Sequence, residues 1–339
     1  QGYSSAASDV YKRQILTGKH SHANGFTDNS STFDGSQQTY PKLLQKAGYE
    51  TAIIGKWHLT SAPTGFDYSE ILIGQGIYYN APFIKNGKQV PSKGYVTNVI
   101  TEKAIDWMEN IHDKNKPFCL LLHHKAPHRT WMPDTCDLQL FSDTTFELPA
   151  NFYDDYNGRQ AAHEQKMSII KDMDLVYDLK MADKENEIHT TTALENAGRS
   201  MYNSMTPEEK AAWDAHYDPI IQKFKKDKLS GKQLSEWKYQ QYMRDYLRVI
   251  HSIDRNIGVL LNYLEKTGLL ENTMIVYTSD QGFYMGEHGW FDKRFMYEES
   301  FRTPLLIRLP GGKKGDIDEF VQNLSLIHIS EPTRPRLIS

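Results

Sequence analysis

The chain has 339 residues, of which 39% are hydrophobic, 12% aromatic and 24% charged, and its formal net charge is -4 at pH 7. This balance is typical of a globular protein and excludes fibrous and wholly disordered chains. Scattered Lys and Arg argue against nucleic acid as a partner, and no apolar run approaches the roughly 18 residues that a membrane-spanning helix needs.

The two ends differ from the rest of the chain. Residues 1–14 and 325–339 show neither helical nor strand periodicity and resemble translated sequencing-adapter sequence. We expect both to be non-native additions, with the fold signal confined to residues 15–324. On this interpretation the chain is cut at its amino end, so the lack of a signal peptide carries no information about localisation.

The first half of the chain contains two predicted helices and two predicted strands. Residues 39–48 predict a short helix with Thr39 as N-cap, and residues 96–111 have apolar side chains at helical spacing. The apolar runs at residues 50–54 and 118–122 predict strands, the second of them buried on both faces. Polar residues follow each strand directly: Lys56 and His58 after the first, and His123, His124, Lys125 and His128 after the second.

The second half begins with a charged, aromatic stretch that predicts a helical insertion over about residues 148–230, including a capping box at Thr206. A long amphipathic helix is expected over residues 233–266. Strands are expected at residues 274–278 and, buried, at 304–309. Helices that alternate with apolar strands predict an α/β fold: a mostly parallel sheet flanked by helices on both faces.

In such sheets the ligand lies at the carboxyl ends of the strands. Six polar residues are expected to meet there: Lys56, His58, His128, Asp280, Gln281 and Lys293. Lysines suit an anion with several oxygens, histidines suit proton transfer, and a carboxylate beside an amide oxygen suits a hard cation.

Four segments carry a resemblance to a known family: ILTG (15–18), GKWH (55–58), HKAPH (124–128) and SDQGFYMGEHGWFDKR (279–294). They resemble the type I sulfatases of the alkaline phosphatase superfamily. The sequences of these segments are most similar to those of bacterial N-acetylglucosamine-6-sulfatases or mucin-desulfating sulfatases. The resemblance implies the alkaline phosphatase-like fold and a sulfuric ester hydrolase that removes O-sulfate, expected to be the 6-O-sulfate of N-acetylglucosamine, from glycosaminoglycan or mucin glycans.

The resemblance also implies a role for each site residue. Lys56 would bind a sulfate oxygen, His58 would contact the nucleophile, and His128 would act as general acid toward the leaving oxygen. Lys293 would bridge sulfate and leaving group. Asp280 and Gln281 match half of the ligands of one Ca²⁺ ion, and Gln281 disfavours the zinc of related phosphatases, which have His there. His288 and Arg294 either line the substrate pocket or fix the loop that carries them.

The family nucleophile, a formylglycine made from a cysteine in a Cys-x-Pro-Ser-Arg signature, has no counterpart here. Neither Cys119 nor Cys136 stands in that context. The signature, the other calcium ligands and the first strand of the sheet would lie upstream of Ile15. We therefore expect a formylglycine and its generating enzyme for the parent protein, and we predict that this chain does not turn over and folds poorly alone.

Several alternatives stay open. Iduronate-2-sulfatase-like specificity, a phosphoesterase of the same superfamily and a non-catalytic protein that binds sulfated glycans all fit the same motifs. The resemblance implies a periplasmic or secreted protein, because the polymeric substrates lie outside the cytoplasm.

Overall fold

The computed structural model describes residues 6–25, 31–185, 187–312 and 314–316. Its helices and strands, in chain order, are α1 (Ala6–Thr17), α2 (Ser21–Asn24), α3 (Tyr40–Lys46), β1 (Glu50–Gly55), β2 (Tyr68–Leu72), β3 (Phe83–Lys85), β4 (Lys88–Val90), α4 (Val96–Asp106) continued by a π-turn (Trp107–Ile111), β5 (Phe118–His123), α5 (Gln160–His163), α6 (Thr192–Asn203), α7 (Pro207–Asp227), α8 (Gly231–Lys266), β6 (Ile275–Thr278), β7 (Tyr284–Met285), β8 (Phe291–Asp292), α9 (Glu298–Phe301) and β9 (Leu305–Arg308). Short 3-10 turns occupy Thr135–Asp137, Leu269–Asn272 and Glu287–Gly289.

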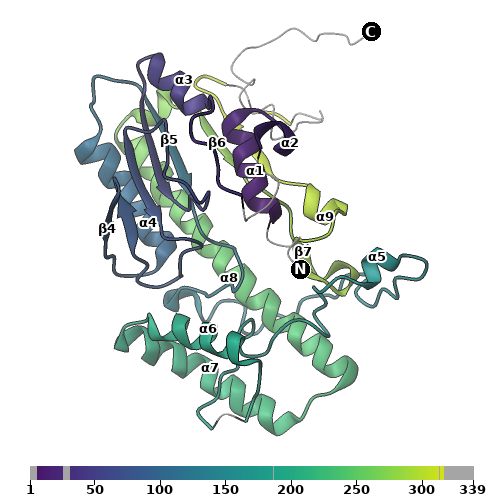
Figure 1. The fold of residues 1–339 in the computed structure, drawn as a ribbon. Coiled ribbons are helices and arrows are strands. Elements are labelled where there is room, and N and C mark those ends of the chain that lie inside the picture. The colour runs from purple at the N-terminus through teal and green to yellow at the C-terminus, as the bar shows by residue number, and fades with distance from the viewer. Residues whose placement is uncertain (1–5, 26–30, 186, 313, 317–339) are drawn as a thin grey trace.

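Five strands form the main sheet in the order β4-β3-β2-β1-β5 (Figure 1). β1 lies parallel to both β2 and β5, whereas β3 and β4 are antiparallel additions at one edge. β6 and β9 form a separate antiparallel pair. The expected α/β fold is confirmed, with the correction that the sheet is mixed: the short hairpin β3–β4 reverses direction because a two-residue turn can join only antiparallel strands.

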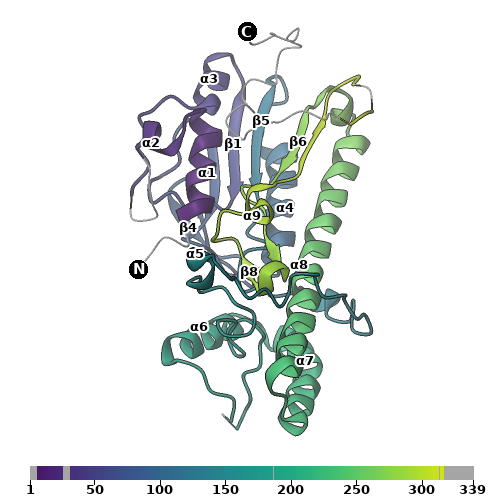
Figure 2. The same ribbon diagram turned by 90° about the vertical axis from the view of Figure 1, so that its right-hand side faces the viewer.

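Helices cover both faces of this sheet, as expected. α4 contacts β1, β5 and α8, while α3 contacts β1 from the other side and α1 contacts α3 (Figure 2). The side chains of β1 alternate accordingly: Ala52 and Ile54 pack into the core under α4 and α8, and Ile53 packs into a second core with Leu16 and Trp57. A strand that buries both faces accounts for the continuous apolar run in the sequence.

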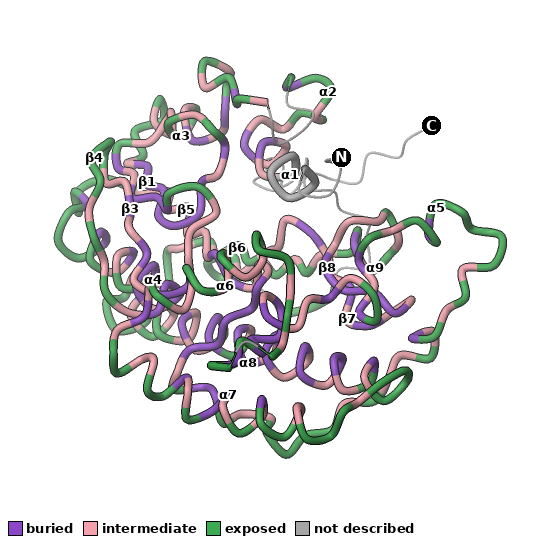
Figure 3. Tube along the Cα trace, turned by 60° about the horizontal axis from the view of Figure 1, so that its bottom comes forward, coloured by how far each residue is buried: buried purple, intermediate pink, exposed green. Residues whose placement is uncertain are grey.

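The segment predicted as a helical insertion contains α5, α6 and α7. α6 and α7 lie beside the amino-terminal half of α8, beyond the end of the sheet, in both ribbon views (Figures 1 and 2). Buried residues lie where α8 faces the rest of the molecule, and exposed residues cover the outer side of α7 (Figure 3). None of the described helices is long and apolar enough to cross a membrane.

Three expectations about local structure are wrong. Residues 6–14, expected to be irregular, are part of helix α1. β5 and β9 were expected to be buried, but only Leu121 of β5 is buried, and Leu306 of β9 is 64% exposed. β5 lines a slot between β5 and β6 that no described strand fills, so its side chains are only partly covered. Among the described strands, β9 pairs with β6 alone.

Candidate active site

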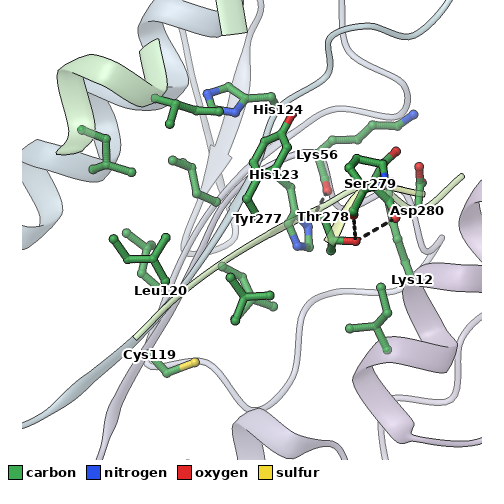
Figure 4. Close-up of a pocket in the computed structure, with 18 of the residues that line it drawn as sticks. Lys12, Lys56, Cys119, Leu120, His123, His124, Tyr277, Thr278, Ser279 and Asp280 are labelled. Atoms are coloured by element: carbon green, nitrogen blue, oxygen red, sulfur yellow. Dashed lines mark hydrogen bonds between the residues drawn. The ribbon is translucent and has the colours of Figure 1, made fainter. Parts of the chain in front are cut away.

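A cavity of about 2280 Å³ runs along this slot and reaches the carboxyl ends of β1, β5 and β6. Its apolar part is lined by β5, β6 and one face of α8. Its polar end brings together five of the predicted site residues, Lys56, His128, Asp280, Gln281 and Lys293. Figure 4 shows Lys56, Ser279 and Asp280 near one another at this end. β1 and β5 are adjacent parallel strands that end at the same sheet edge, which explains why Lys56 and His128 meet here.

Lys56 is held in place by the backbone that precedes it. Gly55 has φ 106°, and a Cβ on it would lie 2.0 Å from the carbonyl oxygen of His123, so only glycine fits between β1 and β5. The amide of Lys56 donates to that same oxygen at 2.7 Å. Lys56 is 4% exposed and lines the cavity. A buried cation there favours an anionic ligand.

His128 lies in the loop after β5. The hydroxyl of Tyr78 donates to the backbone oxygen of His128 at 2.6 Å, and His128 Nδ1 lies 2.7 Å from the backbone oxygen of Arg129. Because a carbonyl oxygen only accepts, Nδ1 carries a proton and Nε2 is left for the cavity. Burial, followed by the charges of Lys293, Lys56 and Lys125, lowers the pKa of His128 well below its ordinary value. An anion bound among these lysines would oppose that shift.

Lys293 follows β8 and is anchored by its neighbour. Its Nζ lies 3.2 Å from Asp292 Oδ1, and Arg294 Nε lies 2.9 Å from Asp292 Oδ2. Burial opposes ionisation of Asp292, but Lys293, Arg294 and Arg129 together keep the pKa of this carboxyl below its ordinary value. The carboxylate thus orients both cations of the loop.

Asp280 and Gln281 follow β6 and fit a hard cation. Gln281 is buried, and its Oε1 has no hydrogen-bond partner in the described part of the chain. The hydroxyl of Ser279 donates to the backbone oxygen of Gln281 at 2.7 Å and so fixes the turn. A buried amide oxygen without a donor is costly unless something binds it, and a cation also held by Asp280 would do so.

A second acidic cluster is a weaker metal site. Ligand atoms of Asp134, Cys136 and Asp137 lie within 4.8 Å of one another. Arg255, however, contacts Asp137 at 2.6 Å and Asp134 at 2.8 Å. The single charge of the guanidinium offsets one of the two carboxylate charges and its hydrogen bonds engage both groups, so this cluster is a weaker cation site.

The other three predicted site residues do not line the cavity. His58 has φ 52°, and its Nδ1 lies 3.2 Å from Gln75 Nε2. His288 Nδ1 lies 2.6 Å from Asp154 Oδ2, and its Nε2 lies 3.3 Å from Asn151 Nδ2. Arg294 is turned to Asp292. In this structure His288 therefore ties its loop to the predicted insertion.

Neither cysteine is placed as a nucleophile for this site. Both thiols are free. Cys119 stands four residues before His123, about 13 Å along the strand, near the apolar part of the slot (Figure 4). Burial raises the pKa of Cys119 to about 12, and burial with Asp134 and Asp137 raises that of Cys136 to about 11. Such thiols are poor nucleophiles at neutral pH.

Sequence reasoning gave no site role to several residues that shape the site, although it noted Lys125 after the second predicted strand. Tyr78 binds the His128 backbone from 50 positions away, and Lys125, which lines the cavity, lies 4.8 Å from the centre of the Tyr78 ring. Arg129 is paired with Asp178, 49 positions distant. A histidine-rich segment after β5 pointed to this region, but no local pattern could have named the distant partners.

Comparison with known proteins shows the family to which the chain belongs. A family model described as Sulfatase matches residues 1–329, a range that includes residues 1–14 and the first five of residues 325–339. An N-acetylglucosamine-6-O-sulfatase of Bacteroides thetaiotaomicron is 57% identical over 300 residues, which are 87% of this chain and 53% of that protein. The human N-acetylglucosamine-6-sulfatase is 24% identical over 345 residues, which cover 93% of this chain and 51% of the relative. The chain thus spans about half the length of these curated relatives.

Solved structures are also similar to the chain. A protein in complex with its substrate, D-glucosamine-2-N,6-O-disulfate, has a TM-score of 0.85 at 55% identity, over 92% of this chain and 63% of that one. A phosphonate monoester hydrolase from Silicibacter pomeroyi has a TM-score of 0.54 at 16% identity, over 91% and 56% of the two chains, which shows a shared fold alone. With a family model over nearly its whole length and a relative of 57% identity, the chain belongs to the sulfatase family.

Proposed function

We propose that the protein from which this chain comes is a sulfuric ester hydrolase that removes the 6-O-sulfate of N-acetylglucosamine in glycosaminoglycan or mucin glycans. The observation that carries the proposal is one cavity in which Lys56, His128 and Lys293 lie with Asp280 and Gln281. Both the Bacteroides and the human relatives are named for 6-sulfated N-acetylglucosamine, which supports this substrate.

In this proposal the lysines of the cavity bind the sulfate group and His128 transfers a proton. A sulfate monoester is an anion that repels nucleophiles, so Lys56 and Lys293 would bind its oxygens and neutralise the charge that develops in the transition state. His128, uncharged in the free site, would gain a proton as the anion approaches and then give it from Nε2 to the leaving sugar oxygen. The roles predicted for His58, His288 and Arg294 stay predictions.

Asp280 and Gln281 would hold a Ca²⁺ ion together with ligands from outside the described site. When bound, such an ion acts as a Lewis acid that polarises the sulfate group. The unpartnered oxygen of Gln281 supports this assignment. Because the chain belongs to the sulfatase family, the same proposal includes a formylglycine nucleophile and the enzyme that generates it. It also includes a periplasmic or secreted location.

Binding to the chain itself tests the proposal. In calorimetry with CaCl₂ present, we expect N-acetylglucosamine 6-sulfate to bind and unsulfated N-acetylglucosamine to bind at least about tenfold more weakly, because charged hydrogen bonds are lost. Lys56→Met and Lys293→Met should each weaken the sulfated sugar by about the same factor. Lys223→Met is the matched control, since that lysine pairs with Asp227 on the exposed face of α7. Tighter binding of 2-sulfated iduronate than of the 6-sulfated sugar would refute the proposed specificity.

A further inference from the structure

Arg129, the residue after His128, is enclosed in the structure although the sequence marks it only as a loop residue. Its Nε donates to Asp178 Oδ1 at 2.6 Å and its Nη2 donates to Asp178 Oδ2 at 2.7 Å. The carboxylate of Asp178 is fully buried, and its Oδ2 also accepts from the amide of Asp174 at 2.8 Å. The guanidinium therefore binds a carboxylate whose own position is fixed by the backbone of the predicted insertion.

The same guanidinium also lies near two aromatic rings. The Arg129 carbon Cζ lies 5.4 Å from the centre of the Tyr177 ring and 5.0 Å from that of Phe291. Phe291 directly precedes Asp292, whose carboxylate orients Lys293. One side chain thus joins three segments: the loop of His128, the insertion at Tyr177 and Asp178, and the loop of Lys293.

The contacts of Arg129 are of two kinds. The paired hydrogen bonds to Asp178 fix the plane of the guanidinium, and the rings of Tyr177 and Phe291 add cation–π contacts. On the other side of His128, its backbone oxygen accepts from Tyr78. The main chain around His128 is therefore held from both directions, which a catalytic side chain needs if its geometry is to be kept within a fraction of an ångström.

We infer that the Arg129–Asp178 pair is a positioning device that sets the imidazole of His128 relative to Lys293, and that the insertion takes part in the active site through Asp178. This inference rests on the proposed roles of His128 and Lys293. It assigns the insertion a function beyond that of a surface helix pair, and it predicts that a lysine cannot replace Arg129, because an ammonium group cannot make the paired contact.

The test compares Arg129→Lys and Asp178→Asn with the unchanged chain. The ring nitrogens of His128 are followed by long-range ¹H–¹⁵N correlation spectra, assigned with His128→Gln, and the binding of inorganic sulfate is measured by calorimetry. We expect both variants to shift the His128 ring signals and to weaken sulfate binding about tenfold, since small misplacements of a binding group have large effects. Asp178→Glu, which keeps the charge, should restore part of the affinity.

Arg255→Lys is the matched control, because Arg255 also binds carboxylates, those of Asp134 and Asp137, but is not adjacent in sequence to a residue that lines the cavity. We expect it to lower thermal stability as the other variants do and to leave the His128 signals and sulfate affinity unchanged. Wild-type signals and affinity in Arg129→Lys would overturn the inference. If the unchanged chain binds no sulfate, the proposed function fails, whereas the His128 signals of the free protein still decide whether the pair positions the ring.

Discussion

Lys125 is a buried lysine of this site whose pKa departs strongly from the ordinary value of its type. It is 6% exposed, lines the cavity, and has no carboxylate partner in the described part of the chain. Burial, followed by the charges of Lys293 and Lys12, lowers the pKa of Lys125 to about 7. Its amine faces the Tyr78 ring and adds to the field that lowers the pKa of His128. At neutral pH this lysine is poised between its charged and neutral forms.

Sulfate binding should therefore depend on pH through Lys125. A bound anion favours the charged amine, so binding takes up a proton where the free amine is neutral, and sulfate affinity should fall as the pH rises above about 7. Calorimetry of sulfate binding in buffers of different ionisation enthalpy measures this uptake. Lys125→Met should reduce both the affinity and the proton uptake, while Lys210→Met, which removes a lysine stacked on Tyr202 away from the cavity, should change neither. Equal pH dependence with and without the Lys125 amine would contradict the assignment.

Among the secondary-structure elements, those that rely on local contacts match their predictions best. β1, α4 and α8 begin and end within a few residues of the expected bounds, and Gly268 after α8 has the left-handed conformation (φ 73°) that ends helices. The capping box of α7 is formed: the amide of Glu209 donates to Thr206 Oγ1 at 3.2 Å, and the amide of Thr206 donates to Glu209 Oε2 at 2.7 Å. Thr39 is also an N-cap, of α3, but its buried hydroxyl has no partner in the described structure.

The two N-cap threonines should therefore respond differently to the same substitution. Thr206→Val removes a capping hydrogen bond and should destabilise the start of α7 by about 1 kcal/mol, a roughly fivefold rise in amide exchange over its first turn. Thr39→Val removes only an unsatisfied buried hydroxyl and should leave exchange in α3 unchanged or slower. Hydrogen exchange followed by mass spectrometry measures both. Equal acceleration in the two helices would show that the cap of α7 contributes nothing specific.

At the scale of the whole molecule, the main feature is the slot between β5 and β6. Its apolar lining includes side chains of α8, among them Ile253, Ile257 and Leu260, and Val276 of β6 is 42% exposed. Two strand edges that face such a slot without a partner lose both hydrogen bonds and apolar burial.

The slot should weaken cooperative unfolding. In scanning calorimetry we expect a broad transition whose calorimetric enthalpy departs from the van't Hoff value, because the two sides of the slot are not joined by a common sheet. The neutral dye Nile red should gain fluorescence on mixing with the folded chain, as apolar side chains there are accessible. A sharp transition with equal enthalpies and no dye binding would contradict this picture of the chain.

The sequence alone determined the alternation of helices and strands, the family, and the polar residues at the strand ends, because each depends on neighbours within a few positions. It also identified five residues that meet in one cavity, Lys56, His128, Asp280, Gln281 and Lys293. Only the tertiary structure decided that His288 is engaged by Asp154, that β5 and β9 are poorly covered, and that Arg129 is held by Asp178. These features depend on contacts between segments far apart in the chain, such as the 49 positions between Arg129 and Asp178, and local periodicity carries no record of which distant side chain will arrive.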